Sequence, residues 1–246
     1  MSLMLQAMTQ LRRLLSFLAF AVGSAVLMMP AEAVLLAQSA APKAAVGDTV
    51  AGESGVFIIR HAGDTVATER FTRTATTLHG TLAIRNAKGT VQAYEAVMAP
   101  DASVPLIEVT VRESQDSGQT NGRILQRARV IFKEDSAAVD DIGTHGLQTR
   151  IFGTERGAMP YLNLSFALLE QAVRRSRATV PVRTQVPFFN LGGGQTVDAK
   201  VTKLGADSLS MAIGSVEFHL RVDAAGRVLG GTIPAQQLVA ERVAGS

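Results

Sequence analysis

The sequence predicts a mainly β protein, in which an antiparallel, strongly curved sheet or open barrel packs around one amphipathic helix. Between residues 55 and 152, short β-branched and apolar runs are divided by turn formers at a spacing of roughly 10 to 12 residues, as in antiparallel all-β proteins. Similar runs return after residue 178. Between the two series, segment 158–177 repeats its apolar residues with the period of a helix.

The predicted strands form two series. Before the helix they are 55–61, 65–74, 77–86, 90–99, 104–113, 123–134, 136–142 and 146–152, and after it they are 179–188, 195–203, 207–213, 216–222 and 227–233. Strict alternation in 104–113 and 216–222 indicates strands with one buried and one solvated face. The clearest turns are 62–64, 86–89 and 100–103. Because Pro181 and Pro187 flank strand 179–188, we expect it to be an edge strand or a bent one.

The helix over 158–177 is predicted to hold Pro160 in its first turn and arginines in its last turn, where the helix dipole favours cations. A helical wheel places four polar residues on one side: Asn163, Glu170, Arg174 and Arg177. The apolar residues cover an arc of roughly 200°, wider than the stripe of about 100° on a helix that lies against a flat surface. A sheet that curves around the helix accounts for this width.

The first 33 residues predict an export signal. Arg12 and Arg13 precede an apolar run, 14–29, and small residues follow this run up to Ala33. The run is shorter than the roughly 20 residues that cross a bilayer, which favours cleavage after Ala33 over a retained membrane anchor. A second cleavage site follows Ser39. The predicted location is the bacterial periplasm or the extracellular medium, with no stable membrane span after processing.

The residues after the signal divide into a leader and one domain. Segment 34–54 is rich in Ala, Gly and small polar residues and follows neither period, which predicts a disordered leader. Residues 55–246 are predicted to form a single antiparallel β domain, because neither charge nor hydrophobicity changes across helix 158–177.

Charge and composition exclude several classes of protein. Without Arg12, Arg13 and Glu32 the chain has 22 basic and 20 acidic residues, so the sequence predicts no nucleic-acid partner. The chain has no cysteine, which rules out a structural disulfide, a thiolate metal site, a cysteine nucleophile and the lipidated cysteine of a lipoprotein. An exported protein of this kind depends on its core for stability.

No motif predicts catalysis, a metal ion or a cofactor. The four histidines are scattered, and the acidic residues of 134–141 lack the spacing of a calcium loop. The glycines at 192–194 precede a strand rather than a helix, so they predict a hairpin loop and not a phosphate-binding loop. Neither a Gly-x-Ser-x-Gly elbow nor a Ser-x-x-Lys motif occurs.

Three stretches, 56–74, 160–175 and 218–227, resemble uncharacterised exported bacterial proteins of unknown function. That resemblance implies no activity. In the order of its elements the chain is also similar to the open half-barrels of periplasmic lipoprotein carriers, whose sheet wraps around helices and shelters acyl chains. This similarity is an architectural analogy. The chain departs from it in having one evident helix with strands on both sides.

We expect an exported, non-catalytic binding protein that shelters a lipid, an acylated protein or another apolar ligand between the curved sheet and the helix. The predicted lining lies on one flank of the helix, at spacings of four, three and four: Leu162, Phe166, Leu169 and Val173. Alternatively, this arc is solid core without a cavity. Two further functions stay open. One is an envelope protein-protein interaction module that adds its exposed edge strand to a partner, and the other is a hydrolase with an unrecognised site.

Overall fold

The computed structural model describes residues 52–85, 89–114, 122–143, 146–178 and 184–243. The strands before the helix are β1 (Glu53–His61), β2 (Asp64–Arg73), β3 (Thr77–Ile84), β4 (Thr90–Val97), β5 (Leu106–Glu113), β6 (Ile124–Phe132), β7 (Ser136–Gly143), β8 (Gly146–Gly153) and β9 (Met159–Tyr161). The helix α2 is Phe166–Ala178. After it come β10 (Gln185–Asn190), β11 (Gln195–Lys203), β12 (Ser208–Ile213), β13 (Val216–Val222), β14 (Val228–Ile233) and β15 (Leu238–Val243). The predicted export signal and residues 34–51 of the predicted leader lie outside the described residues.

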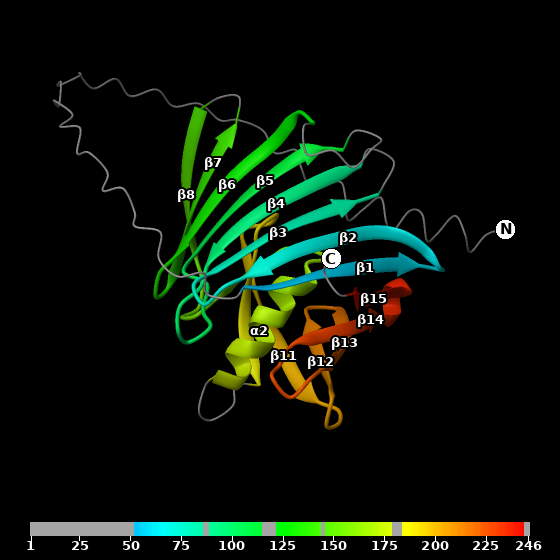
Figure 1. The fold of residues 1–246 in the computed structure, drawn as a ribbon. Helices are drawn as coiled ribbons and strands as arrows, with labels where there is room; N and C mark the ends of the chain where they lie inside the picture. Colours follow the sequence, from blue (N-terminus) through cyan, green and yellow to red (C-terminus); the bar gives the residue numbers. More distant parts are fainter. Residues whose placement is uncertain (1–51, 86–88, 115–121, 144–145, 179–183, 244–246) are drawn as a thin grey trace, which may run out of the picture. The chain divides into compact units, whose positions relative to one another are not determined.

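The 15 strands of the described residues belong to one sheet. Figure 1 shows its curved arrangement. The strand order is β8-β7-β6-β5-β4-β3-β2-β1-β15-β14-β13-β12-β11-β10-β9. Neighbouring strands are antiparallel except β9 and β10, which are parallel. Strands β1 and β15 come from opposite ends of the described chain and pair in the middle of the sheet, where they join two meanders.

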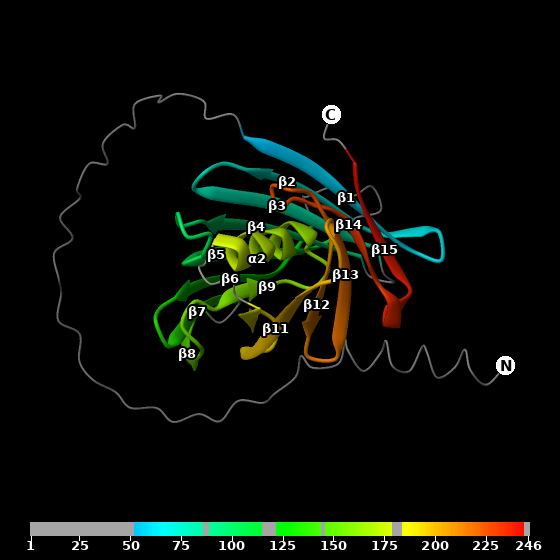
Figure 2. The same ribbon diagram turned by 90° about the horizontal axis from the view of Figure 1, so that it is seen from below.

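The sheet curls so that strands from its two ends approach each other. The ring of Phe189 in β10 lies 5.8 Å from that of Phe132 in β6 and 5.7 Å from that of Phe152 in β8. Thr196 Oγ1 donates a hydrogen bond of 2.8 Å to Thr154 Oγ1, which follows β8. No ladder joins β8 to β9 in the described part of the chain, so the sheet is strongly curved but not closed into a barrel. Figure 2 shows α2 inside this curve.

The helix and the inner face of the sheet form one hydrophobic core. The ring of Phe166 in α2 lies 5.5 Å from Phe57 in β1 and 6.4 Å from Phe218 in β13. The helix also contacts β2, β9, β10 and β14. Every residue from Phe166 to Val173 is buried. The wide predicted apolar arc is therefore confirmed as that of a helix enclosed by a curved sheet.

Most predicted strands and their alternation are confirmed. In β5, Ile107 and Val109 are buried while Glu108 between them is exposed. The sequence analysis missed β9 and β15, which are short and depend on their neighbours: β15 pairs with both β1 and β14.

The edge strand differs from the prediction. The strand expected at 179–188 is β10, at 185–190, and it pairs with β11 on one side and with β9 on the other. At this end of the sheet the edge position belongs to the three-residue strand β9. Pro160 lies in β9, where a missing N–H group is tolerated because an edge strand has one open side.

The helix begins at Phe166 and not at residue 158. After β9, Leu164 turns the chain with a φ of 65°. Ser165 then caps the helix, because its Oγ accepts a hydrogen bond of 3.3 Å from the Leu168 N–H. Leu162 therefore precedes the helix instead of lying on its flank. The proline that suggested a first helical turn is equally compatible with an edge strand, so it did not mark the start.

The first strand begins two residues before the predicted domain boundary. Glu53 and Ser54 were predicted as the end of the leader. In the structure they belong to β1 and pair with Arg73 and Thr72 of β2. Glu53 Oε1 also accepts a hydrogen bond of 2.6 Å from Arg242 Nη2. These long-range contacts hold both residues in the sheet, although their composition resembles that of a leader.

Candidate functional site

The four residues predicted to line a ligand cavity contribute to the core. Phe166, Leu169 and Val173 are at most 2% exposed. Leu162 is partly buried and packs against the same hydrophobic cluster. None of the four lines either of the two surface hollows described below. The structure brings these residues together as packing residues, and ligand contact by them stays a prediction.

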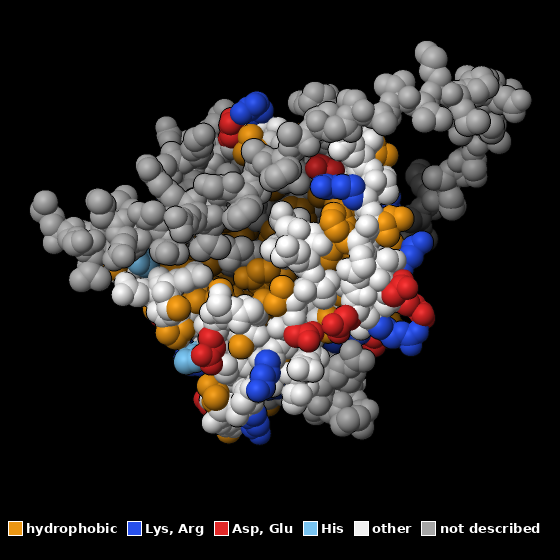
Figure 3. All heavy atoms as spheres, turned by 180° about the vertical axis from the view of Figure 1, so that it is seen from behind, with side chains coloured by type: hydrophobic (Ala, Val, Ile, Leu, Met, Phe, Trp, Pro, Cys, Tyr) orange, Lys and Arg blue, Asp and Glu red, His pale blue; other side chains and the backbone are white. Residues whose placement is uncertain are grey.

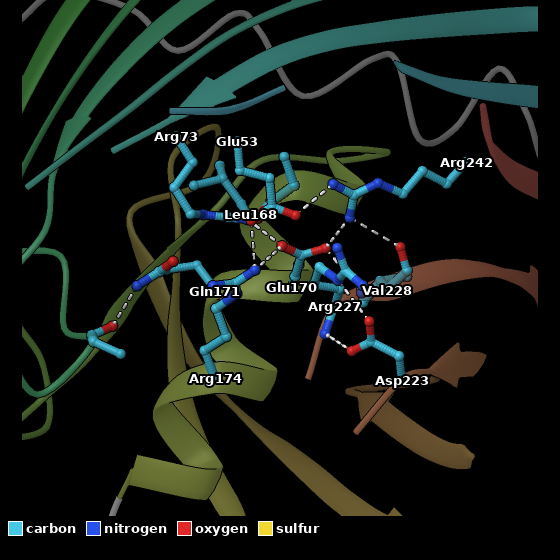
Figure 4. A network of polar contacts seen from close by, with 12 residues as sticks. Glu53, Arg73, Leu168, Glu170, Gln171, Arg174, Asp223, Arg227, Val228 and Arg242 are labelled. Carbon is cyan, nitrogen blue, oxygen red and sulfur yellow. Dashed lines mark hydrogen bonds and ion pairs between the residues drawn. The ribbon is translucent and has the colours of Figure 1, made fainter. Parts of the chain in front are cut away.

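The polar side of α2 is also buried, and it carries an ionic cluster (Figure 4). Glu170 is fully buried. Its carboxylate accepts hydrogen bonds from Arg73 Nη1, from Arg174 Nη2 at 3.0 Å and from Arg242 Nη1 at 2.7 Å. The backbone N–H of Val228 donates a fourth hydrogen bond, of 2.8 Å. Because Arg73 lies in β2, Arg242 in β15 and Val228 in β14, this one carboxylate ties the helix to both meanders.

Glu53 completes the ionic cluster from β1. It accepts hydrogen bonds from Arg242 Nη2 at 2.6 Å and from Arg174 Nη2 at 2.7 Å, and Arg73 Nη1 lies 3.6 Å away. Burial raises the pKa of Glu53, but the hydrogen bond from Arg242 and the charges of the three arginines outweigh burial, so the pKa is lowered. The ionic cluster thus contains two carboxylates, of Glu53 and Glu170, and three guanidinium groups, of Arg73, Arg174 and Arg242.

A further buried carboxylate fixes the start of the helix. Glu69 of β2 is fully buried and accepts hydrogen bonds from Tyr94 Oη at 2.6 Å, Ser165 Oγ at 2.5 Å and the Ala167 N–H at 3.0 Å. Burial raises the pKa of Glu69, although these hydrogen bonds act in the opposite direction. A carboxylate at a helix N-terminus also interacts favourably with the helix dipole. Because Ser165 is buried, we assign this group a structural role and not that of a nucleophile.

A pocket of about 200 Å³ opens beside the ionic cluster. It lies between α2, the turn after β2 and the loop that follows β4. Its lining includes Arg73, Thr74, Met98, Gln171, Arg174 and residues of the 99–102 loop. Gln171 Nε2 donates a hydrogen bond of 3.1 Å to the Ala102 carbonyl oxygen, which fixes the helix to that loop.

Three buried polar atoms of the residues that line this pocket have no hydrogen-bond partner among the described residues. They are Arg73 Nε, Arg174 Nε and Gln171 Oε1. Arg73 is 4% exposed and Gln171 is 3% exposed. Arg73 Nη1 and Arg174 Nη2 donate to carboxylates of the ionic cluster, and Arg73 Nη2 donates to the Ala167 carbonyl oxygen at 3.0 Å. The Nε–H group of each arginine remains. Native proteins rarely bury such groups without a partner, and all three belong to residues that line the pocket.

An ion pair holds the 99–102 loop against the helix. Arg175 Nη1 donates a hydrogen bond of 2.8 Å to Asp101 Oδ2, while Asp101 Oδ1 accepts from the N–H and the hydroxyl of Ser103 at 3.0 and 2.6 Å. Burial raises the pKa of Asp101, but the hydrogen bonds from Ser103 and Arg175 outweigh burial and lower it to about 2.

The lowered pKa of Asp101 predicts a pH-dependent contribution to stability. A depressed pKa in the folded state means that the ionised carboxylate stabilises the fold above its ordinary pKa of 3.8 and that this contribution disappears as the pH falls towards about 2. We expect wild-type protein to be more stable than Asp101→Asn at pH 6, with the difference shrinking below pH 4. Urea unfolding of both proteins across this range measures it, and a difference that stays constant down to pH 2 would refute the assignment.

A larger hollow, of about 490 Å³, lies on the outer face of β2–β5. Its charged side chains include Arg70, His79, Glu95 and Glu108, and all four are exposed. His79 Nδ1 lies 3.7 Å from Glu95, and Arg129 Nε lies 3.5 Å from Glu108. Seen from behind, charged and hydrophobic side chains are mixed on the surface (Figure 3). Because this hollow buries no unpaired polar group, we take the smaller pocket beside α2 as the candidate site.

The described residues contain no group of three His, Asp or Glu side chains that could hold a metal ion. His219 lies on the solvated face of β13, as predicted, with its Nε2 atom 3.2 Å from Glu217 Oε1. His145 falls outside the described residues. Within them, no helix combines the length and the apolar character needed to cross a membrane.

The sequence analysis missed the ionic cluster, although one signal points to it. It grouped Glu170 and Arg174 on the polar side of the helix, whereas the structure buries Glu170 completely. In β2, Glu69 and Arg73 alternate in phase with the buried Phe71, so both belong to the inner face. A charged residue at an inward position of a strand requires a buried partner, but the sequence does not show which residue that partner is.

The sequence matches no protein-family model and no curated protein. Two solved structures are similar in fold. One is a DUF1089 family protein from Pseudomonas aeruginosa, with 12% identity and a TM-score of 0.49, covering 71% of this chain and 92% of that one. The other is a β-barrel-like protein of the domain of unknown function DUF1849 from Brucella abortus, with 10% identity and a TM-score of 0.47, covering 78% of this chain and 95% of that one.

Proposed function

We propose that this chain is a non-catalytic binding protein that holds an anionic group of its ligand in the pocket beside α2. The observation that carries the proposal is the set of three buried, unpartnered polar atoms on Arg73, Gln171 and Arg174. Two of these atoms belong to guanidinium groups, whose N–H donors form strong, charge-assisted hydrogen bonds with oxyanions.

The charges around the pocket favour an anion over a neutral ligand. The ionic cluster contains three arginines but only two glutamates. The neighbouring Arg175 and Arg227 are paired with Asp101 and Asp223, so they leave this balance unchanged. The ionic cluster itself therefore carries one more positive than negative charge beside the pocket, while the buried carboxylate of Glu69, on the same strand as Arg73, accepts hydrogen bonds from Tyr94, Ser165 and the Ala167 N–H and not from an arginine. A buried charge without a counter-charge is costly, and a bound anion removes that cost.

The size of the pocket limits the bound group. A volume of about 200 Å³ is below the range of roughly 300 to 1,000 Å³ for pockets that enclose drug-sized ligands. Gln171 Oε1 requires a donor, which the P–OH group of a singly protonated phosphate ester supplies. The proposed ligand group is therefore a phosphate monoester, borne by a lipid headgroup or by a soluble molecule. This revises the expected apolar shelter, because Phe166 and Leu169 are packed in the core.

Inorganic phosphate tests the site. The melting temperature of protein expressed from the full chain is measured against phosphate, with chloride at the same ionic strength as the reference. A ligand that binds only the folded state stabilises it by about 2.7 kcal/mol at a hundredfold excess over its Kd. We expect the melting temperature to rise with phosphate, and Arg174→Gln to remove most of that rise. Arg60→Gln is the matched control, because Arg60 forms an exposed ion pair with Glu241.

Two short-chain lipids distinguish the sources of the phosphate group. Dihexanoyl phosphatidic acid carries a phosphate monoester, and dihexanoyl phosphatidylcholine carries a diester with a bulky choline. A larger rise with phosphatidic acid than with inorganic phosphate indicates a lipid headgroup, and an equal or smaller rise indicates a soluble ligand. A protein that responds to neither phosphate nor phosphatidic acid would overturn the proposal, as would equal losses in Arg174→Gln and Arg60→Gln.

Export of the protein is part of the same proposal. Its support is the apolar run 14–29 between Arg13 and the small residues that end at Ala33. We expect the mature protein from a bacterial envelope fraction to begin at Val34, or at Ala40 if the second cleavage site is used. N-terminal sequencing measures this directly. An N-terminus that precedes Leu14 in the envelope fraction would indicate a retained anchor instead of a cleaved signal.

A further inference from the structure

The edge strand β8 is unusually open for a strand at the end of a sheet. It pairs with β7 on one side and forms no ladder with another described strand on its other side (Figure 1). Near its end, the ring of Phe152 lies 5.7 Å from that of Phe189 in β10. All residues of β8 except Phe152 are exposed, and Leu147 and Ile151 are 64% and 75% exposed. Natural edge strands are usually short, charged or covered, because their free backbone N–H and C=O groups pair readily with another strand.

Ile151 of β8 continues a row of apolar side chains on the outer face of the sheet. The row crosses five strands, and each residue lies opposite the next: Val97, Leu106, Ile131, Ala138 and Ile151. The residues that alternate with this row on β5, β6 and β7, such as Ile107, Val130 and Val139, are buried in the core. The row therefore faces outward and stops at the open edge of β8.

The sequence of β8 is complementary to itself in one antiparallel register. When Thr149 lies opposite Thr149 of a second copy, Leu147 of each copy lies opposite Ile151 of the other, and Gln148 lies opposite Arg150. The apolar pairs extend the outer row, and no like charges meet. Centring the pair on Arg150 would place two arginines opposite each other, and centring it on Gln148 would place Leu147 opposite Thr149. Cross-strand pairing therefore favours the register centred on Thr149.

We propose that two copies of this chain associate through β8 as a two-fold symmetric, antiparallel pair centred on Thr149. Such an isologous contact uses the same surface on both copies and closes, so it gives a dimer and not a filament. The dimer joins two 15-stranded sheets into one continuous sheet. It covers the four exposed side chains of Leu147 and Ile151, two from each copy. This interface lies on different elements from the pocket beside α2 and does not depend on the proposed ligand.

The absence of cysteine from the chain permits a direct crosslinking test. In the proposed register the two Thr149 residues are directly opposite, with Cα atoms about 4.5 to 5.5 Å apart, within the range that a disulfide spans. We expect Thr149→Cys, introduced into the full chain, to give a covalent dimer under mild oxidation. Leu147→Cys is the matched control on the same strand and face, and it is expected to give no covalent dimer because the two Leu147 residues lie four positions apart in register.

Opposite charges introduced at Leu147 and Ile151 give a second test of the dimer that does not depend on oxidation. Sedimentation velocity across protein concentrations is expected to show a dimer for wild type and a monomer for Ile151→Lys or Leu147→Asp alone. The double variant is expected to dimerise again, because each new aspartate faces a new lysine of the other copy. Leu204→Lys is the control, since Leu204 is 57% exposed outside β8. A wild-type monomer at all concentrations, or a dimer that Ile151→Lys leaves intact, would overturn the proposal.

Discussion

Replacing Glu170 with alanine is expected to lower the free energy of unfolding by about 3 to 5 kcal/mol, the usual cost of removing one partner from a buried ionic cluster. The carboxylate accepts hydrogen bonds from Arg73, Arg174, Arg242 and the Val228 N–H. Without it, the three arginines keep only Glu53 as a carboxylate partner, and the Val228 N–H loses its acceptor. Urea unfolding monitored by far-ultraviolet circular dichroism measures the loss.

Glu241→Ala is the matched control for this experiment. Glu241 forms an ion pair of 2.6 Å with Arg60, but its side chain is 54% exposed. Exposed pairs of this kind contribute at most about 1 kcal/mol. Similar small losses for Glu170→Ala and Glu241→Ala would mean that Glu170 is solvated in solution and that the ionic cluster is not a buried anchor of the helix.

Replacing Phe166 with alanine is expected to cost about 3 to 5 kcal/mol, the range for truncating a fully buried aromatic side chain. Phe166 is 1% exposed and packs between Phe57 of one meander and Phe218 of the other. Its loss leaves a cavity between the two halves of the sheet, and contacts on both sides are lost together. The same urea titration measures this change.

Leu204→Ala provides the comparison for an exposed apolar side chain and is expected to change stability by no more than about 0.5 kcal/mol. The contrast tests whether α2 fills the curved sheet. If Phe166→Ala were as mild as Leu204→Ala, the core beside the helix would be loose, and a sheltered apolar ligand along Phe166, Leu169 and Val173 would again be the better hypothesis.

The sequence predicts the architecture well where the physical signal is local. Alternation in β5 and β13 reflects one buried and one solvated face, which needs no knowledge of the partner strands. The wide apolar arc of 158–177 likewise predicts a curved sheet around a helix. Elements that depend on distant partners were missed. β15 is a strand because it lies between β1 and β14, and Pro160 fits an edge strand as well as a helix start.

The candidate site lay beyond prediction for the same reason. Arg73 and Glu170 are 97 residues apart in the chain and meet only because β2 passes over the helix. Glu69 is separated by 98 residues from the Ala167 N–H that it binds. Inward alternation in β2 indicates that Glu69 and Arg73 need buried partners, but only the curvature of the sheet identifies them. The pocket depends on the same long-range contacts, because two of its lining residues, Arg73 and Arg174, also belong to the ionic cluster.

The most direct measurement of the proposed ligand site is a phosphate titration followed by NMR of the arginine Nε–Hε groups, at constant ionic strength. We expect the Nε–Hε signals of Arg73 and Arg174 to shift together and to saturate with one Kd, because these groups are unpartnered donors of residues that line the pocket. The signal of Arg60, in its exposed pair with Glu241, is expected to stay unchanged. Signals of Arg73 and Arg174 that do not respond, or that shift no more than that of Arg60, would contradict a phosphate site beside α2.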